Sequence, residues 1–151
     1  MNHPQIYLDT SVISAYFDER APDRRNLTRR FWGERLPEFS GVISDLVLEE
    51  IRDTRDELRR EQMVLLVEPL TVAPRTQDAA RLAVEYIRRG VLPPADFDDA
   101  LHLALATTNG IGILLSWNFR HLVRLATRRE VNLLNSLLDY GPLEILAPPE
   151  L

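Results

Sequence analysis

Three aspartates stand at the start of one strongly apolar segment. Residues 93–106 read PPADFDDALHLALA, in which Asp96, Asp98 and Asp99 precede a run of apolar residues. The prolines and acids favour the start of a helix, with Asp96 as its cap, and the apolar run favours a helix that is buried on most sides. Two interpretations fit these acids. They either cap the helix and complement its dipole, or they belong to a cation site that needs further oxygen ligands from elsewhere in the chain.

Further polar side chains follow other candidate strands. Asp9 comes directly after a short strand candidate at residues 5–8, and Asn118 closely follows a strongly apolar strand candidate at residues 111–116. Glu49 and Glu50 lie in the second turn of a helix after a strand at 41–44, and they point about 100° apart, so one of them is expected to face the same crevice as Asp9. Open parallel sheets bind ligands at the carboxyl ends of their strands. Asp9, Glu50, Asp99 and Asn118 are therefore expected to converge along one edge of the sheet.

Strand and helix patterns alternate along the whole chain. This alternation predicts an α/β fold with right-handed crossovers, a mostly parallel sheet and helices on both faces. The length of 151 residues fits one domain spanning residues 1–151. Residues 119–138 are expected to form a long helix, residues 143–146 a last short strand, and residues 147–151 a tail.

The composition excludes several kinds of chemistry. The chain has no cysteine, so disulfides, thiolate nucleophiles and cysteine-based zinc sites are ruled out, and any metal must bind to oxygen or histidine. The first residues carry no basic and apolar signal segment, and apolar runs such as residues 64–67 are too short to span a bilayer. A cytoplasmic protein with no membrane partner is expected.

All of the basic residues are arginines, and the formal net charge is −5. Many arginines occur in pairs, such as Arg24 with Arg25 and Arg128 with Arg129. Most pairs are expected to be solvated helix faces. Arginine also grips phosphate in two-point geometry, so a few of them are candidates for contact with a polyanion.

Four short motifs in this order resemble the PIN-domain nucleases, and in particular VapC-like toxins of type II toxin–antitoxin systems. They are YLDTS ending at Ser11, SDLVLEEI ending at Ile51, DALHLALA beginning at Asp99, and LLSWNFRH ending at His121. The likeness covers essentially the whole chain. It implies a compact α/β/α fold with an acidic pocket that binds Mg²⁺ or Mn²⁺ and cuts RNA. It also implies a protein antitoxin and, as in many relatives, a homodimer.

The resemblance assigns catalytic and metal-binding roles to four residues. The first three family acids fall on Asp9, Glu50 and Asp99, and the fourth, usually an aspartate, falls on Asn118. An amide oxygen is able to bind a metal or its water but contributes no charge, which puts a second tightly held metal in doubt. Clustered carboxylates resist ionisation unless a cation offsets them, so the grouping makes chemical sense.

Neighbouring residues receive lesser roles. Ser11 and Ser116 are expected to cap a helix or turn, or to orient carboxylates, and Glu49 to be a solvated neighbour of Glu50. Two roles are possible for Asp96 and Asp98: they cap the helix, or they support the metal ligands. Other neighbours have open roles: His102 is packed against a carboxylate or acts as a base, Trp117 packs in the core or stacks on a base, and Arg120 and His121 are solvated or meet phosphate.

Two rival functions differ in class. A phosphotransfer enzyme with Asp9 as nucleophile is disfavoured, because Ser11 replaces the second acid of the Asp-x-Asp pattern and the chain has no lysine to bind the phosphate. The other rival is a catalytically weak or inactive PIN-like module that binds RNA or a protein without cutting. The sequence does not exclude this second rival, and an RNA cleavage assay distinguishes it from the nuclease.

Overall fold

The computed structural model describes residues 3–151 and has an α/β fold built on a five-stranded, all-parallel sheet. The strands lie in the order β3-β2-β1-β4-β5. Their bounds are β1 (Gln5–Leu8), β2 (Ser40–Ser44), β3 (Thr71–Ala73), β4 (Ile113–Leu115) and β5 (Glu144–Leu146). The predicted α/β class and parallel sheet are confirmed.

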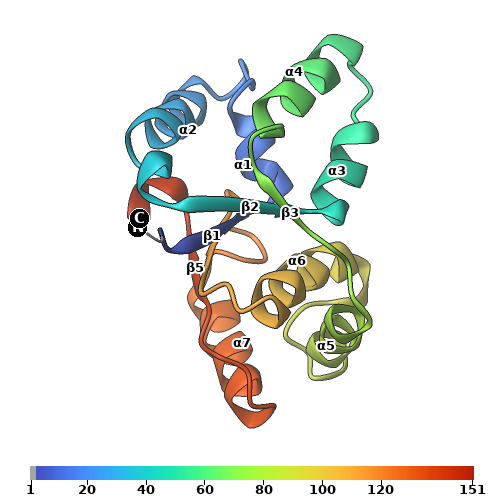
Figure 1. Cartoon of the computed structure of the whole chain (residues 1–151). Helices are drawn as coiled ribbons and strands as arrows, with labels where there is room; N and C mark the ends of the chain where they lie inside the picture. The colour runs from blue at the N-terminus through green and yellow to red at the C-terminus, as the bar shows by residue number, and fades with distance from the viewer. Residues whose placement is uncertain (1–2) are drawn as a thin grey trace.

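Helices cover both faces of this sheet, with α1 to α4 on one side and α5 to α7 on the other (Figure 1). The longer helices are α1 (Thr10–Ala15), α2 (Pro22–Glu34), α3 (Asp45–Arg52), α4 (Glu57–Val67), α5 (Gln77–Arg88), α6 (Phe97–Thr108) and α7 (Leu125–Leu137). Three short 3₁₀ turns are η1 (Leu36–Glu38), η2 (Pro94–Asp96) and η3 (Pro148–Glu150). Right-handed crossovers place α1 to α4, which lie in the connections from β1 to β3, on one face, and α5 to α7, which lie in the connections from β3 through β4 to β5, on the other.

The core helix is α6, as the sequence predicts. Every residue in 100–107 is buried, and α6 packs extensively against α5. The central strand β1 is equally enclosed, because Ile6, Tyr7 and Leu8 have no exposed surface. A strand buried on both faces is what a parallel sheet with two helical layers requires.

The structure corrects three expectations about the elements. The strand β3 was not predicted, since its three residues between the proline-flanked loops are too few to show a pattern. The long helix expected at 119–138 begins only at Leu125, because the backbone N–H groups of Leu122 and Val123 both bond to the carbonyl of Asn118 in a turn. The expected tail is instead η3, which is held against the protein.

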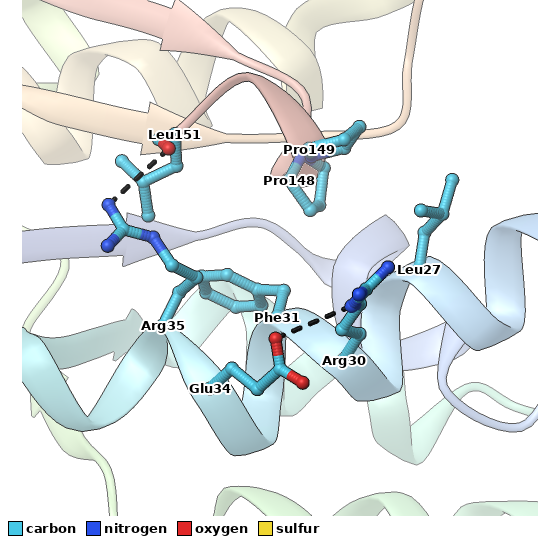
Figure 2. A pocket seen from close by; sticks show the side chains of 8 residues that line it. All are labelled: Leu27, Arg30, Phe31, Glu34, Arg35, Pro148, Pro149 and Leu151. Carbon is cyan, nitrogen blue, oxygen red and sulfur yellow. Dashed lines mark hydrogen bonds and ion pairs between the residues drawn. The ribbon is translucent and has the colours of Figure 1, made fainter.

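The C-terminal η3 packs on α2 and borders a hollow of about 240 Å³. Figure 2 shows Pro148 and Pro149 facing Phe31 across this hollow, with Arg35 donating to the carbonyl of Leu151 at 3.4 Å. The hollow lies between α2 and the C-terminal segment, and none of its lining residues belongs to the predicted acidic set. No helix within the described part of the chain has the length and apolar character needed to cross a membrane.

Candidate active site

The order of the strands creates a crevice between β1 and β4. The chain first moves outward from β1 to β3 and then returns to the other side of β1, so the direction of winding reverses between β1 and β4. Such a reversal leaves an open crevice at the carboxyl ends of the two strands, where α/β proteins bind ligands. Asp9 follows β1 there, and its backbone N–H bonds to the carbonyl of Leu115 at 3.2 Å. Asn118 lies three residues beyond the end of β4.

Asp9 is buried at the end of the central strand, with 4% of its surface exposed. It caps α1, since its Oδ1 accepts from the backbone N–H of Ser11 at 3.0 Å and also from the Ser11 hydroxyl. The Ser11 Oγ in turn accepts from the backbone N–H of Trp117 at 2.9 Å. Burial raises the pKa of Asp9 above its ordinary value, and the charge of Glu50 adds to this rise.

Glu50 is held by a chain of polar side chains that crosses the sheet. Its Oε1 accepts from the hydroxyl of Thr10 at 2.8 Å and lies 2.6 Å from Nε2 of His102. The other ring nitrogen of His102 lies 2.7 Å from the hydroxyl of Tyr7, which is 2.8 Å from that of Ser44. Burial acts to raise the pKa of Glu50, but the hydrogen bond and charge of His102 outweigh it and the net shift is downward.

Asp99 faces the loop after β4. The side-chain amide of Asn118 donates to Oδ2 of Asp99 at 3.2 Å, and Oδ1 of Asn118 accepts from the backbone N–H of His121 at 2.9 Å. Burial raises the pKa of Asp99 to about 6, and the charges of Asp9 and Asp96 contribute to the rise. Asp9, Glu50 and Asp99 thus stand close enough for each to interact electrostatically with another acid of the set.

The neighbouring residues take simpler roles than some of those proposed from the sequence. Asp96 occupies the position before α6 without capping it, and its carboxylate instead lies 3.4 Å from Nε2 of His121, so the predicted cap is wrong. Asp98 is exposed, and Glu49 is an exposed partner of Arg75, as expected of a solvated neighbour.

Two aromatic residues of the motifs are core residues. His102 is 3% exposed and packed against a carboxylate, which was one of the two expectations for it. Its pKa is raised, because the Glu50 hydrogen bond and the nearby acids outweigh burial, which acts to lower it. Trp117 is 7% exposed, which fits core packing, and its Nε1 donates to the hydroxyl of Thr28 at 2.9 Å.

The donor chemistry of the acids fits a hard divalent cation, which prefers oxygen ligands. The buried Asp9 and the partly buried Asp99 are carboxylates with raised pKa values, and a cation would offset their mutual repulsion. Within residues 3–151, however, no three acidic or histidine side chains are already gathered at metal-binding distances. Asp9, Glu50, Asp99 and Asn118 therefore line one crevice, but their side chains are not yet arranged as a complete set of metal ligands.

Sequence reasoning missed the residues that hold the acids in place. Thr10 and Tyr7 are adjacent or nearly adjacent to Asp9, yet nothing in their spacing indicates that they bond to Glu50 and His102 across the fold. Arg24 was seen only as one of several paired arginines. Its guanidinium lies over the rings of Trp117 and Phe119, at 5.0 and 5.8 Å from their centroids. Only the packing of α2 on the loop after β4 reveals this contact.

The chain belongs to the PIN domain family, whose sequence pattern matches residues 6–127. This assignment agrees with the parallel sheet and with acids at its carboxyl edge. A comparison with curated protein sequences gave no significant match.

Solved structures of VapC toxins and VapBC complexes have a similar fold. VapC20 of Mycobacterium tuberculosis, a sarcin-ricin loop cleaving toxin, has a TM-score of 0.58 at 22% identity over 76% of this chain and 92% of its own. VapBC-1 of nontypeable Haemophilus influenzae has a TM-score of 0.60 at 14% identity over 96% of this chain and 98% of its own. VapBC-5 of M. tuberculosis, a member of the VapBC family of toxin–antitoxin systems, has a TM-score of 0.54 at 19% identity over 95% of this chain and 98% of its own. At these identities the likeness establishes the fold alone.

The raised pKa of Asp99 predicts a specific dependence of stability on pH. Between the ordinary value of 3.8 and about 6, the folded protein binds more protons at this site than the unfolded chain does, so stability falls as the pH rises through this range. Asp99→Asn should therefore raise the free energy of unfolding at neutral pH without metal, and with it the melting temperature. The gain should shrink as the pH falls from about 6 to about 4 and should vanish below about 4.

The measurement is thermal unfolding followed by circular dichroism across this pH range. Asp98→Asn, one position away and exposed, is the matched control and should show no such trend. A loss of stability in Asp99→Asn at neutral pH would contradict the electrostatic description of the site.

Proposed function

We propose that this protein is a metal-dependent endoribonuclease that hydrolyses RNA phosphodiester bonds with Mg²⁺ or Mn²⁺. The observation that carries the proposal is the meeting of Asp9, Glu50 and Asp99 at the β1–β4 crevice of a PIN-domain chain. Proteins of this family generally use divalent metals. In this proposal the three acids and Asn118 bind the ion or its water.

The electrostatics of the residues suit this chemistry. A bound divalent cation would supply an activated water and stabilise charge on the phosphate oxygens. Asp9 and Asp99 are the acids with raised pKa values, whose repulsion a cation would relieve, whereas the hydrogen bond and charge of His102 favour the ionised form of Glu50. Asn118 orients Asp99 with its amide and shapes the following turn with its oxygen. No side-chain nucleophile is needed, since water is the attacking group.

The test is cleavage of a labelled single-stranded RNA by purified protein with Mg²⁺, with Mn²⁺ and with EDTA. The wild type should cut only with a divalent ion. Asp9→Asn and Asp99→Asn should lower the rate about a hundredfold or more, because each removes a charge that holds the ion. Glu50→Gln should also impair cleavage, whereas Glu49→Gln, its exposed neighbour, should leave the rate unchanged.

Circular dichroism of each variant would establish that it is folded. Cleavage that persists in a folded Asp99→Asn variant would refute the assignment of the site. A folded wild type that binds RNA and never cuts it would favour the binding module over the enzyme.

The solved relatives support a more specific role as the toxin of a toxin–antitoxin pair. Two of the similar structures are VapBC systems from different bacteria, and each extends over more than nine-tenths of this chain. In this proposal the protein is neutralised by a protein antitoxin and, as in the family resemblance, forms a homodimer.

Growth of bacteria expressing the chain tests the toxin role. Expression of the wild type should arrest growth, expression of Asp99→Asn should not, and co-expression of the product of an adjacent small open reading frame should restore growth. Equal growth with wild type and Asp99→Asn, at matched protein levels, would contradict the toxin role while leaving the nuclease activity to the cleavage assay.

A further inference from the structure

Among the described residues, the guanidinium of Arg24 differs from that of most arginines in having no polar partner. Others are engaged by carboxylates or backbone carbonyls: Arg75 pairs with Glu49, and Arg29 donates to the carbonyl of Tyr16. Within residues 3–151 the Arg24 guanidinium takes part in no hydrogen bond or ion pair, although the residue is exposed. Its N–H donors therefore stay available for an anion from outside the chain.

Two aromatic rings fix the position of this guanidinium without using its donors. The Arg24 Cζ lies 5.0 Å from the centroid of Trp117 and 5.8 Å from that of Phe119. A ring face attracts a cation through its quadrupole. The Trp117 ring is itself anchored, since its Nε1 donates to Thr28, whose hydroxyl donates to the carbonyl of Arg24 at 2.7 Å. Phe119 is the outer ring, and 48% of its surface is exposed.

This group borders the acidic crevice. The backbone N–H of Trp117 donates to the same Ser11 hydroxyl that bonds to Asp9. Asn118, which donates to Asp99, lies between the two aromatic residues in the chain. The contacts thus connect the Arg24 position to both Asp9 and Asp99 through one short segment of backbone.

We propose that Arg24 binds a backbone phosphate of the RNA substrate beside the acidic crevice, with Trp117 and Phe119 as its positioning residues. The inference rests on the proposed ribonuclease function. A chain with net charge −5 and an acidic site repels a polyanion, so productive binding needs a fixed cation close to the site. A planar guanidinium held on rings meets this need, because it presents two parallel N–H donors to phosphate.

The experiment measures the affinity of a short fluorescein-labelled single-stranded RNA by anisotropy, with Ca²⁺ in place of Mg²⁺, over a range of salt concentrations. Arg24→Ala should weaken binding about tenfold, the expected loss of one charged hydrogen-bonded contact. It should also reduce the slope of log Kd against log salt by about 0.7, the value for one phosphate contact on a single strand. Arg24→Lys should recover the slope but only part of the affinity, because a lysine does not stack.

Two further variants separate this role from general charge and from folding. Arg129→Ala removes the same charge from an exposed position on α7 and should have a smaller effect on affinity with no comparable change in slope. Phe119→Leu should weaken binding in the wild type and have little effect in the Arg24→Ala background, because the ring acts through the guanidinium. Circular dichroism and melting temperature check that each variant is folded.

The proposal is overturned if Arg24→Ala and Arg129→Ala are indistinguishable in affinity and slope, if Phe119→Leu has the same effect in both backgrounds, or if the wild type does not bind this RNA. Metal-dependent cleavage is measured in parallel on the same RNA. Arg24-dependent binding without cleavage would refute the nuclease function and keep the phosphate site. Cleavage of the RNA with an affinity that does not depend on Arg24 would refute the phosphate site and keep the nuclease function.

Discussion

The buried carboxylate of Asp9 and the hydroxyl of Ser11 set the geometry on which the acidic crevice depends. Asp9 is buried at the end of the central strand, and burying a carboxylate is unfavourable unless hydrogen bonds compensate it. Ser11 supplies two of these bonds and also accepts from Trp117, so one hydroxyl joins the end of β1 to the segment after β4. The reversal of the sheet provides the crevice, and this contact fixes the distance across it.

The three acids of the crevice are electrostatically unequal. Glu50 has a partner in His102, and the chain through Tyr7 and Ser44 connects that pair to the strands β1 and β2. Within residues 3–151, Asp9 and Asp99 have no basic partner at hydrogen-bonding distance, and their pKa values are raised by burial and by neighbouring acids. The unbalanced charge therefore lies between these two aspartates. On this account they are where a divalent cation brings the largest gain, and Glu50 is the preorganised third acid.

The sequence predicted the sheet class, the buried α6 and the neighbourhood of the four candidate residues, because strand ends and helix starts carry local signals. It did not predict β3, whose three residues are too short for a period, or the turn that delays α7 until Leu125. It also assigned Asp96 to a cap that its contact with His121 replaces. The contacts of Thr10 with Glu50 and of Arg24 with Trp117 could not be predicted from the sequence. In each pair the two residues are distant in the chain, and their contact depends on tertiary packing.

The central claim is that the Asp9 and Asp99 carboxylates together bind a divalent cation. Electron paramagnetic resonance of free Mn²⁺ during titration with the protein measures this directly, without RNA. The wild type should remove Mn²⁺ from solution saturably, Asp9→Asn and Asp99→Asn should each weaken that binding strongly, and Glu49→Gln should match the wild type. Equal Mn²⁺ binding by the wild type and the folded Asp9→Asn and Asp99→Asn variants, or no binding by any of them, would contradict the account.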